Sequence, residues 1–445
     1  MRPFRFYIAS LGCPKNTVDS QAMATLLSRA GYEVTLQPED ADLVIVNTCG
    51  FIASARQESL DTLRDLARGL RGHQRLVAAG CWAQRDPDAL IAAIPRLDAV
   101  LGTRSWPEIL SLAGQLLPSH HGPVLSRVAE IPVMLPEQVH TAGYVVSGAS
   151  AFLKIGDGCN RQCAFCAIPA IKGPFRSRSI EAIVEDVLQL QSMGVLEINL
   201  IAQDATYYGH DLGLKDGLVQ LLERLVNVAP DVPWLRILYA FPGYVTPRLI
   251  TAMAQFPQIL PYLDIPLQHA HPDVLRRMHR PSDVDWVRHT VERLRTTLPD
   301  VALRTTFIVG YPGETEAEFQ TLLDFVNEMR FDRVGVFTYS HEAGTAAADL
   351  MDDVSSEEKE ERRERLMLTQ QDISLDLNAR WVGRRLPVLL EGVGDGLTVG
   401  RSYRDAPEID GLVLIQEEIP PHRIATVEIT EAMEYDLVGR VVESV

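Results

Sequence analysis

Short β-branched apolar runs alternate with amphipathic stretches over the first hundred residues. The runs are Arg5–Leu11, Asp42–Asn47 and Arg75–Ala79, and helical periodicity covers Thr17–Ala30 and Ala53–Leu70. Strands that alternate with helices are typical of parallel strands joined by right-handed crossovers. The pattern therefore predicts a doubly wound α/β domain at residues 1–115, and the prolines that follow predict a linker at residues 116–144.

The middle of the chain repeats the strand–helix alternation six times. The candidate strands are Phe152–Ile155, Glu197–Ile201, Trp234–Tyr239, Tyr262–Ile265, Ala302–Val309 and Arg333–Thr338. The first helix has Ser179 as its predicted N-cap and Gly194 at its end. Six units are two fewer than the eight of a closed parallel barrel. The pattern therefore predicts an open (β/α)6 barrel over residues 145–378.

The last hundred residues change from helix to strand patterning. Ser355 and Glu358 predict a capping box at the start of a highly charged helix, which we interpret as a solvated connection between two domains. Five short apolar runs separated by turns follow, and they predict a small closed β-barrel at residues 379–445. The expected fold class is α/β, with two parallel-strand domains and a C-terminal all-β domain.

Composition narrows the class of protein. The 445 residues are 46% hydrophobic and 23% charged, as in soluble globular proteins. No apolar run reaches the roughly 20 residues of a membrane span, and no cleavage-site pattern follows the N-terminal run. We therefore expect a cytosolic protein, whose six cysteines stay reduced and serve as ligands, nucleophiles or core residues. The net charge of −17 argues against nucleic-acid binding and favours a basic protein partner or a small substrate.

Cys159, Cys163 and Cys166 have CxxxCxxC spacing directly after the first predicted barrel strand. Three thiolates on one loop can hold a 4Fe–4S cluster and leave one iron open. S-adenosylmethionine (SAM) can chelate that iron, and an electron passed through it can release a 5′-deoxyadenosyl radical. A structural zinc site takes four protein ligands, and three buried structural cysteines so close together would be unusual. The spacing therefore predicts a radical-SAM site at the barrel mouth.

Cys13, Cys49 and Cys81 each follow a predicted strand of the first domain. The carboxyl ends of parallel strands share one sheet edge, where ligands bind. The three thiols can therefore converge on a second cluster. Three separate buried thiols are the alternative that the residues alone leave open.

These motifs together resemble the methylthiotransferase family over essentially the whole chain. The resemblance implies an N-terminal α/β domain, a radical-SAM barrel and a C-terminal TRAM barrel. It also implies that Cys13, Cys49 and Cys81 bind an auxiliary 4Fe–4S cluster, and that the CxxxCxxC cysteines bind the cluster that cleaves SAM. The implied cofactors are two 4Fe–4S clusters and SAM, and the implied electron donor is a protein such as flavodoxin or ferredoxin.

Two motifs distinguish the branches of this family. SLGCPKNTVDS at Ser10–Ser20 and GRSYRDAPEIDG at Gly400–Gly411 are similar to the branch that modifies an aspartate of small-subunit ribosomal protein twelve. The implied reaction makes 3-methylthio-aspartate: a SAM-derived radical removes hydrogen from the β-carbon, and sulfur and methyl come from the auxiliary cluster. The implied substrate is that protein, free or in the small ribosomal subunit.

Charge supports the same branch. Residues 376–445 contain thirteen acidic residues, seven arginines and no lysine. A barrel that binds tRNA should be basic, whereas an acidic one suits a basic ribosomal protein. A tRNA adenosine methylthiotransferase is the alternative enzyme, and a non-catalytic ribosome-binding iron–sulfur protein is the alternative from another class. An acidic surface without a partner also remains open.

Four further residues are candidate SAM contacts. Phe165 lies between the cluster ligands, where it can pack beside adenine or fill the loop core. Gln203 and Asp204 follow the second barrel strand, where they can contact SAM or cap a helix. Arg304 lies on the fifth strand, and its side chain can face the barrel interior.

Two other motifs belong to the same domain. GYPGE at Gly310–Glu314 predicts a tight turn at the barrel mouth, with SAM as its candidate ligand. QHAHPDVLRRMHR at Gln268–Arg280 is rich in histidine and arginine, and it predicts a solvated helix face rather than a substrate contact.

Overall fold

The structure is a computed structural model that describes residues 2–118, 122–132 and 143–444. Part of the predicted linker, including Pro136, lies outside the described residues. The chain forms two compact units. The first joins the chain up to Val145 with Asp157–Arg176 and Glu342–Thr345, and the second contains Val146–Gly156, Ser177–His341 and the chain from Ala346. Within the described residues, no helix is long and apolar enough to cross a membrane.

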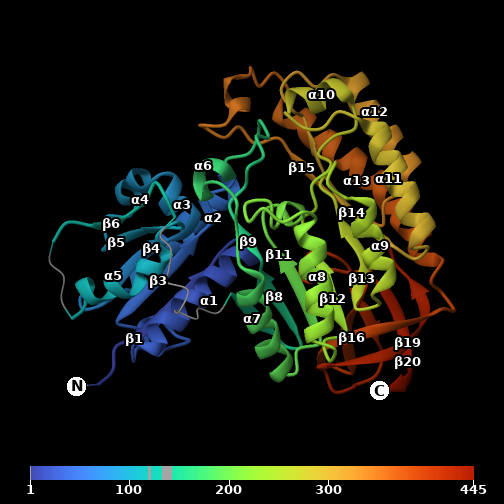
Figure 1. Cartoon of the computed structure of the whole chain (residues 1–445). Coiled ribbons are helices and arrows are strands. Elements are labelled where there is room, and N and C mark those ends of the chain that lie inside the picture. The colour runs from blue at the N-terminus through green and yellow to red at the C-terminus, as the bar shows by residue number, and fades with distance from the viewer. Residues whose placement is uncertain (1, 119–121, 133–142, 445) are drawn as a thin grey trace. The chain divides into compact units, whose positions relative to one another are not determined.

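A six-stranded parallel sheet forms the centre of the first unit, in the order β2-β1-β3-β4-β5-β6 (Figure 1). Its strands are β1 (Arg5–Ser10), β2 (Glu33–Val34), β3 (Leu43–Thr48), β4 (Arg75–Ala79), β5 (Ala99–Gly102) and β6 (Leu125–Arg127). The alternating pattern predicted β1, β3 and β4. β6 lies inside the segment predicted as a linker, because three residues are too short to show a period.

Helices cover both faces of this sheet, as expected for a doubly wound domain. They are α1 (Pro14–Arg29), α2 (Ala53–Gly69), α3 (Gly80–Arg85), α4 (Pro87–Ala93) and α5 (Ile109–Leu116). Successive strand residues point to opposite faces. Ile45 accordingly packs with Met23 of α1 and Leu112 of α5, whereas Val44 packs with Leu63 of α2.

The second unit contains a seven-stranded sheet in the order β15-β14-β13-β12-β11-β8-β7. Its strands are β7 (Tyr144–Ser147), β8 (Ser150–Lys154), β11 (Glu197–Ile201), β12 (Trp234–Ile237), β13 (Ile259–Asp264), β14 (Ala302–Val309) and β15 (Arg333–Thr338). The six strands from β8 to β15 are parallel. The sheet ends at β15 and β7 without closing, which confirms the predicted open barrel.

Helices lie between the successive barrel strands along the chain (Figure 1). They are α7 (Ile180–Ser192), α8 (Gly217–Val228), α9 (Pro247–Gln255), α10 (Pro272–Arg277), α11 (Val284–Thr297) and α12 (Glu316–Met329). Ser179 caps α7 as predicted, because its side chain accepts a hydrogen bond from Ala182 N–H at 3.3 Å. Asp157–Arg176, with the short helix α6 (Ile168–Lys172), leaves this barrel and joins the first unit.

Helix α13 (Ser356–Ala379) connects the barrel to the last domain. Ser355 Oγ accepts from Glu358 N–H at 3.1 Å, but the Glu358 carboxylate bonds to Arg362 instead of returning to Ser355. Only half of the predicted capping box forms. The prediction of a solvated helix is also wrong for one face of α13, where Arg362 and Leu366 are buried.

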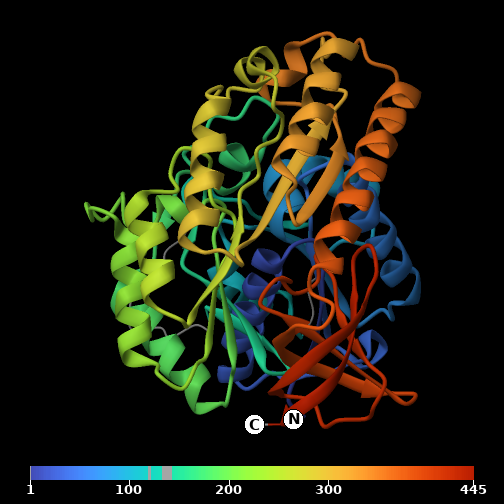
Figure 2. The ribbon, with the colours of Figure 1, turned by 90° about the vertical axis from the view of Figure 1, so that its right-hand side faces the viewer.

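Five strands close into the predicted C-terminal barrel, drawn in red in Figure 2. They are β16 (Arg385–Gly394), β17 (Leu397–Ser402), β18 (Val413–Ile415), β19 (Arg423–Ala432) and β20 (Leu437–Ser444).

The GRSYRDAPEIDG motif lies against the amino ends of the (β/α)6 barrel strands. Arg401 pairs with Glu197, the first residue of β11, and Asp405 pairs with Arg333, the first residue of β15. Asp410 accepts a hydrogen bond from the Tyr262 hydroxyl of β13 at 2.7 Å. These charged side chains therefore fasten the small barrel to the large one.

Candidate iron–sulfur site

Cys13, Cys49 and Cys81 lie at the carboxyl ends of β1, β3 and β4, three neighbouring strands of the first sheet. Cys13 is the exposed N-cap residue of α1, Cys49 is half-buried in a loop, and Cys81 is buried in α3. Cys81 interacts electrostatically with both other thiols. The sheet thus brings together three sulfur donors that are far apart in the sequence.

Asn16 joins the three loops that carry these cysteines. Its Nδ2 donates to the carbonyl of Leu11 at 2.9 Å and to that of Thr48 at 3.1 Å. Its Oδ1 accepts from Cys81 Sγ at 3.6 Å. Asn47 Nδ2 in turn donates to the Asn16 carbonyl at 2.8 Å. Because Asn16 is buried and bonded to every loop, it fixes their spacing.

A glycine beside each of two cysteines allows the loops to approach. A Cβ added to Gly12 would lie 2.8 Å from Cys49 Cβ, and one added to Gly80 would lie 2.2 Å from Asn47 Oδ1. Both glycines have positive φ angles, of 86° and 94°. The cradle around the thiols therefore depends on residues without side chains.

The Cys49 and Cys81 thiols need a positive partner to ionise. Burial raises the pKa of the Cys49 thiol, and it raises the pKa of Cys81 to about 12, although Lys172 opposes the second rise. Cluster irons supply such a charge, and cysteine ligates them as the thiolate rather than the thiol. The donor set and the cradle fit an iron–sulfur cluster held by Cys13, Cys49 and Cys81.

Cys159, Cys163 and Cys166 lie on one loop between β9 (Gly156–Asp157) and α6. Cys159 N–H donates to the Gly173 carbonyl at 3.0 Å, and Cys166 N–H donates to that of Cys163 at 3.1 Å. Arg161 N–H donates to Cys159 Sγ at 3.4 Å. The loop is therefore curled, its three cysteines are half-buried, and one backbone N–H donates to a cysteine sulfur. This arrangement fits a second iron–sulfur cluster.

The first unit holds both cysteine triplets. Cys81 packs with Ala167, which follows Cys166 directly, and with Ile171 of α6. Arg104, in the loop after β5, donates to the carbonyls of Ala170 and Ile171 at 2.6 and 2.9 Å. These contacts attach the CxxxCxxC loop to the domain that carries the other triplet, a connection that the sequence did not reveal.

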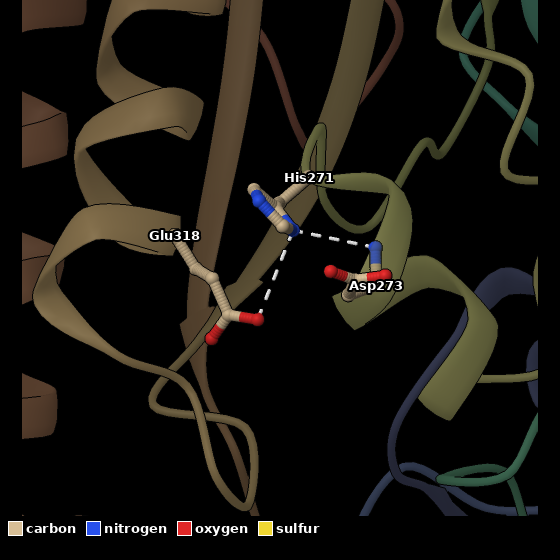
Figure 3. A group of neighbouring side chains, drawn as sticks. All are labelled: His271, Asp273 and Glu318. Carbon is tan, nitrogen blue, oxygen red and sulfur yellow. Dashed lines mark hydrogen bonds and ion pairs between the residues drawn. The ribbon is translucent and has the colours of Figure 1, made fainter.

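Neither triplet has the spacing of a single-ion site. A single metal ion needs three or more histidine nitrogens, cysteine sulfurs or carboxylate oxygens close together. Among the described residues, only His271, Asp273 and Glu318 bring three such atoms within 4.8 Å of one another (Figure 3). Their polar atoms already have partners: His271 Nδ1 accepts from Asp273 N–H, and Glu318 bonds to Arg277 at 3.0 and 3.1 Å. We therefore interpret this group as the caps of α10 and α12.

The remaining predicted SAM contacts lie in different surroundings. Phe165 is half-buried in the cysteine loop, and Gln203 is half-buried after β11. Asp204 is buried and accepts from the Thr206 hydroxyl at 2.5 Å. Arg304 pairs with Asp264 at 3.0 Å and with Asp410 at 3.3 Å. No SAM contact of these four residues is tested, and all four stay predictions.

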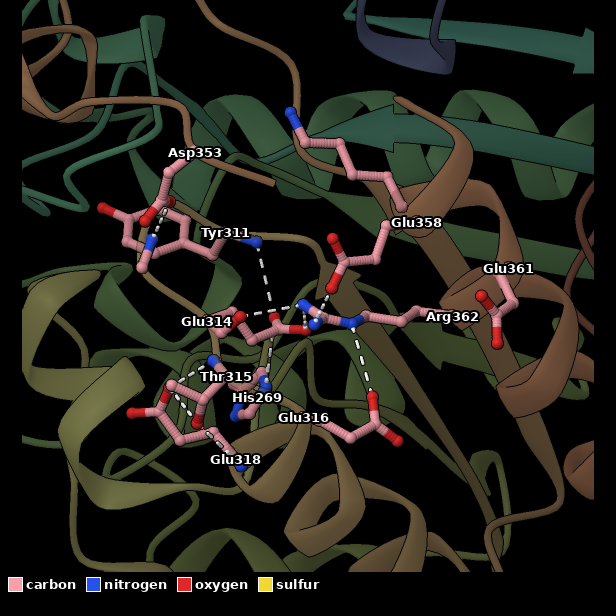
Figure 4. Close-up of polar contacts among 12 residues, drawn as sticks. His269, Tyr311, Glu314, Thr315, Glu316, Glu318, Asp353, Glu358, Glu361 and Arg362 are labelled. Carbon is pink, nitrogen blue, oxygen red and sulfur yellow. Dashed lines mark hydrogen bonds and ion pairs between the residues drawn. The ribbon is translucent and has the colours of Figure 1, made fainter. Parts of the chain in front are cut away.

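Side chains of α13 contact the GYPGE turn (Figure 4). Arg362 donates to the Glu314 carboxylate at 2.9 Å, and His269 Nε2 lies 3.5 Å from the same carboxylate. A Cβ on Gly310 would lie 2.2 Å from Lys359 Cγ. The predicted solvated face of Gln268–Arg280 is wrong for His269 and Arg280, which are buried. The turn's contact with SAM stays a prediction.

Sequence reasoning missed Asn16, Asp19 and Lys172. A signal was present in α1, where Asn16, Asp19 and Ser20 recur at positions i, i+3 and i+4 and are all buried. A polar stripe at this spacing indicates a helix face that meets a buried polar site. Lys172 carried no comparable signal, because its partners come from distant parts of the chain.

Comparison with known families divides the chain into three matches. Residues 5–102 match the Uncharacterized protein family UPF0004, residues 153–326 match the Radical SAM superfamily, and residues 382–442 match the TRAM domain. The fold also resembles the radical SAM methyltransferase TsrM from Kitasatospora setae, with a TM-score of 0.56 and 14% identity. That likeness covers 90% of this chain and 77% of TsrM.

Two relatives match nearly the full length. A protein of Chloroflexus aurantiacus is 48% identical over 98% of this chain and 99% of its own length. A protein of a Roseiflexus species is 47% identical over 99% of this chain and 98% of its own. Both are named ribosomal protein uS12 methylthiotransferase RimO. The chain therefore belongs to the RimO family of radical-SAM methylthiotransferases.

Proposed function

We propose that this enzyme replaces a hydrogen on the β-carbon of an aspartate of ribosomal protein uS12 with a methylthio group. The observation that carries the proposal is the presence of two cysteine triplets in one structural unit of a chain from the RimO family. The names of the relatives support uS12 as the substrate, and the tRNA alternative is not favoured.

The roles of the two triplets differ. Cys159, Cys163 and Cys166 would hold the cluster that cleaves SAM, and Cys13, Cys49 and Cys81 would hold the auxiliary cluster. When bound, these groups supply a carbon radical strong enough to remove an unactivated hydrogen, and the sulfur that replaces it. The protein binds and spaces the thiolates: Asn16 connects the loops of the first triplet, and the backbone around Cys159 curls the second.

The charge of the C-terminal barrel supports a basic protein partner. Arg401 is buried in an ion pair with Glu197, and Arg404 is buried in an ion pair with Asp332. Neither positive charge can therefore contact the phosphates of a nucleic acid. Glu417 and Glu418 are exposed on the loop after β18. The surface that remains is acidic and suits a basic protein better than RNA.

The test offers both substrates to the reconstituted enzyme. With SAM and a reductant, uS12 should gain one methylthio group in place of one hydrogen, and tRNA should not change. Supplying uS12 free and within the small subunit identifies the form used, and flavodoxin or ferredoxin can replace the chemical reductant. A methylthio group on tRNA alone would contradict the proposal, and unchanged SAM would contradict the radical assignment.

A further inference from the structure

Lys172 lies between the segments that carry the two cysteine triplets. Its Nζ is 2.8 Å from Asp19 Oδ2 and 3.2 Å from Asp157 Oδ2. Asp19 belongs to α1, which begins directly after Cys13, and Asp157 precedes Cys159 by two residues. The Lys172 and Asp19 side chains are each only 4% exposed. One buried ammonium therefore joins the two halves of the site.

The helix that carries this charge packs against Cys81. Ile171, the residue before Lys172, packs with Cys81 and Ala167 in one buried cluster. The ammonium interacts electrostatically with Cys81, and Asp19 does so with the opposite sign. Burial opposes the charge on Lys172, but Asp157 and Asp19 hold its pKa well above the ordinary value. Lys172 is therefore a permanent positive charge, and little water screens it.

A purely mechanical role does not explain this pair. Arg104 already holds α6 through the carbonyls of Ala170 and Ile171, which are neutral acceptors. Burying an ion pair carries a desolvation penalty that the attraction of the two charges does not always repay. The fold nevertheless places a buried lysine and a buried aspartate next to a predicted cluster ligand, which indicates an electrostatic role.

We propose that Lys172 is a positioning residue that raises the reduction potential of the cluster held by Cys13, Cys49 and Cys81, and that Asp19 moderates this effect. The proposal rests on the proposed function, in that these cysteines bind a cluster. Reduction adds one negative charge to the cluster, and a nearby positive charge stabilises that state. Lys172 thereby makes the auxiliary cluster easier to reduce.

The test uses the full chain with Cys159, Cys163 and Cys166 replaced by alanine, so that only the auxiliary cluster assembles. Dithionite supplies one electron per cluster in a mediated titration, and electron paramagnetic resonance reports the reduced fraction. Lys172→Met should shift the midpoint to lower potential, and Asp19→Asn should shift it to higher potential. Lys172→Arg keeps the charge and should retain the original midpoint.

The opposite signs separate an electrostatic role from a structural one, since general damage would move both variants in the same direction. Equal midpoints in all variants, or shifts of one sign, would overturn the proposal. Iron and sulfide per chain are measured for each variant, and Asp19→Asn decides the matter if Lys172→Met does not assemble a cluster. A triple-alanine chain that assembles no cluster would instead refute the two-cluster assignment itself.

Discussion

Arg401 in the C-terminal barrel forms an ion pair with Glu197 at the start of β11, with 2.6 Å between Nη2 and Oε2. The Glu197 side chain is fully buried and is shared with Arg236, 2.8 Å away. One carboxylate therefore pairs with two buried guanidinium groups that come from different domains, and Glu391 is a second partner of Arg401. This relationship is one of several polar contacts that attach the two barrels, together with those of Asp405 and Asp410.

Replacing Glu197 with glutamine should destabilise the second unit strongly. The change leaves Arg236 and Arg401 buried with less compensation, and breaking a buried pair costs about 3–5 kcal/mol. Urea unfolding followed by intrinsic tryptophan fluorescence measures the loss, and Trp381, which is buried near the same junction, contributes to the signal.

Glu428→Gln is the matched control, because the partner of Glu428, Arg440, is exposed. Its cost should stay below about 1 kcal/mol. Equal effects of the two substitutions would show that the junction does not depend on Glu197.

The contribution of Glu197 to the free energy of unfolding should also depend on pH. Burial opposes its ionised form, but Arg236 and Arg401 lower the pKa of Glu197 to about 2 from an ordinary value of 4.5. A carboxyl whose pKa is lower in the folded state stabilises the fold above its unfolded pKa and loses this effect as pH falls. The stability difference between wild type and Glu197→Gln should therefore be constant near neutral pH. It should shrink as pH falls from about 4.5 towards 2, and a difference that grows on acidification would contradict the assignment.

Asn16→Ala should impair the auxiliary cluster selectively. The substitution removes the donors to Leu11 and Thr48 and the acceptor for Cys81, so the three cysteine loops lose their common link. Iron per reconstituted chain should fall towards the content of one cluster, while reductive cleavage of SAM continues.

Asn227→Ala provides the control, since Asn227 is exposed and bonds only within α8, to the Glu223 carbonyl. It should leave the iron content unchanged. Full iron loading in Asn16→Ala would show that the loops keep their spacing without this residue.

Glu342→Gln should loosen the first turn of α2. The buried Glu342 carboxylate accepts from Ala53 N–H and from Arg85, both at 2.8 Å, and it also pairs with Arg56. A negative charge at a helix N-terminus satisfies free N–H groups and complements the helix dipole. Hydrogen exchange at residues 53–57 should accelerate, with little change in α5 of the same unit. Unaltered exchange at Ala53 would show that the charge is dispensable.

Reversing the exposed acidic charge should slow the reaction with uS12. Glu417→Lys combined with Glu418→Lys makes the surface less attractive to a basic protein, so kcat/KM should fall most at low ionic strength. Its difference from wild type should narrow as salt is added, because salt screens exposed charges. SAM cleavage without uS12 should be unaffected. Glu292→Lys on α11 is an exposed control with a single charge reversal, to be compared with Glu417→Lys alone, and an equal loss in the two would indicate a general charge effect.

Local sequence pattern was sufficient to predict most of the strands and the CxxxCxxC group of cysteines. The strands Arg75–Ala79, Glu197–Ile201, Ala302–Val309 and Arg333–Thr338 were predicted with the bounds that the structure has. Alternation of strands and helices repeats along the chain, so a single sequence shows it directly. Short or edge strands such as Leu125–Arg127 carry too few residues to show a period.

The sequence by itself determined the order of three domains, the presence of two groups of three cysteines and the acidity of the C-terminal barrel. Only the tertiary structure decided which distant groups meet: Asn16 with three cysteine loops, Lys172 with Asp19, and Arg401 with Glu197. The physical reason is that periodicity records which face of an element is buried, whereas a charge pair depends on which faces come together. Burial then strengthens the attraction within the two charge pairs, because water no longer screens it, although desolvation opposes this gain.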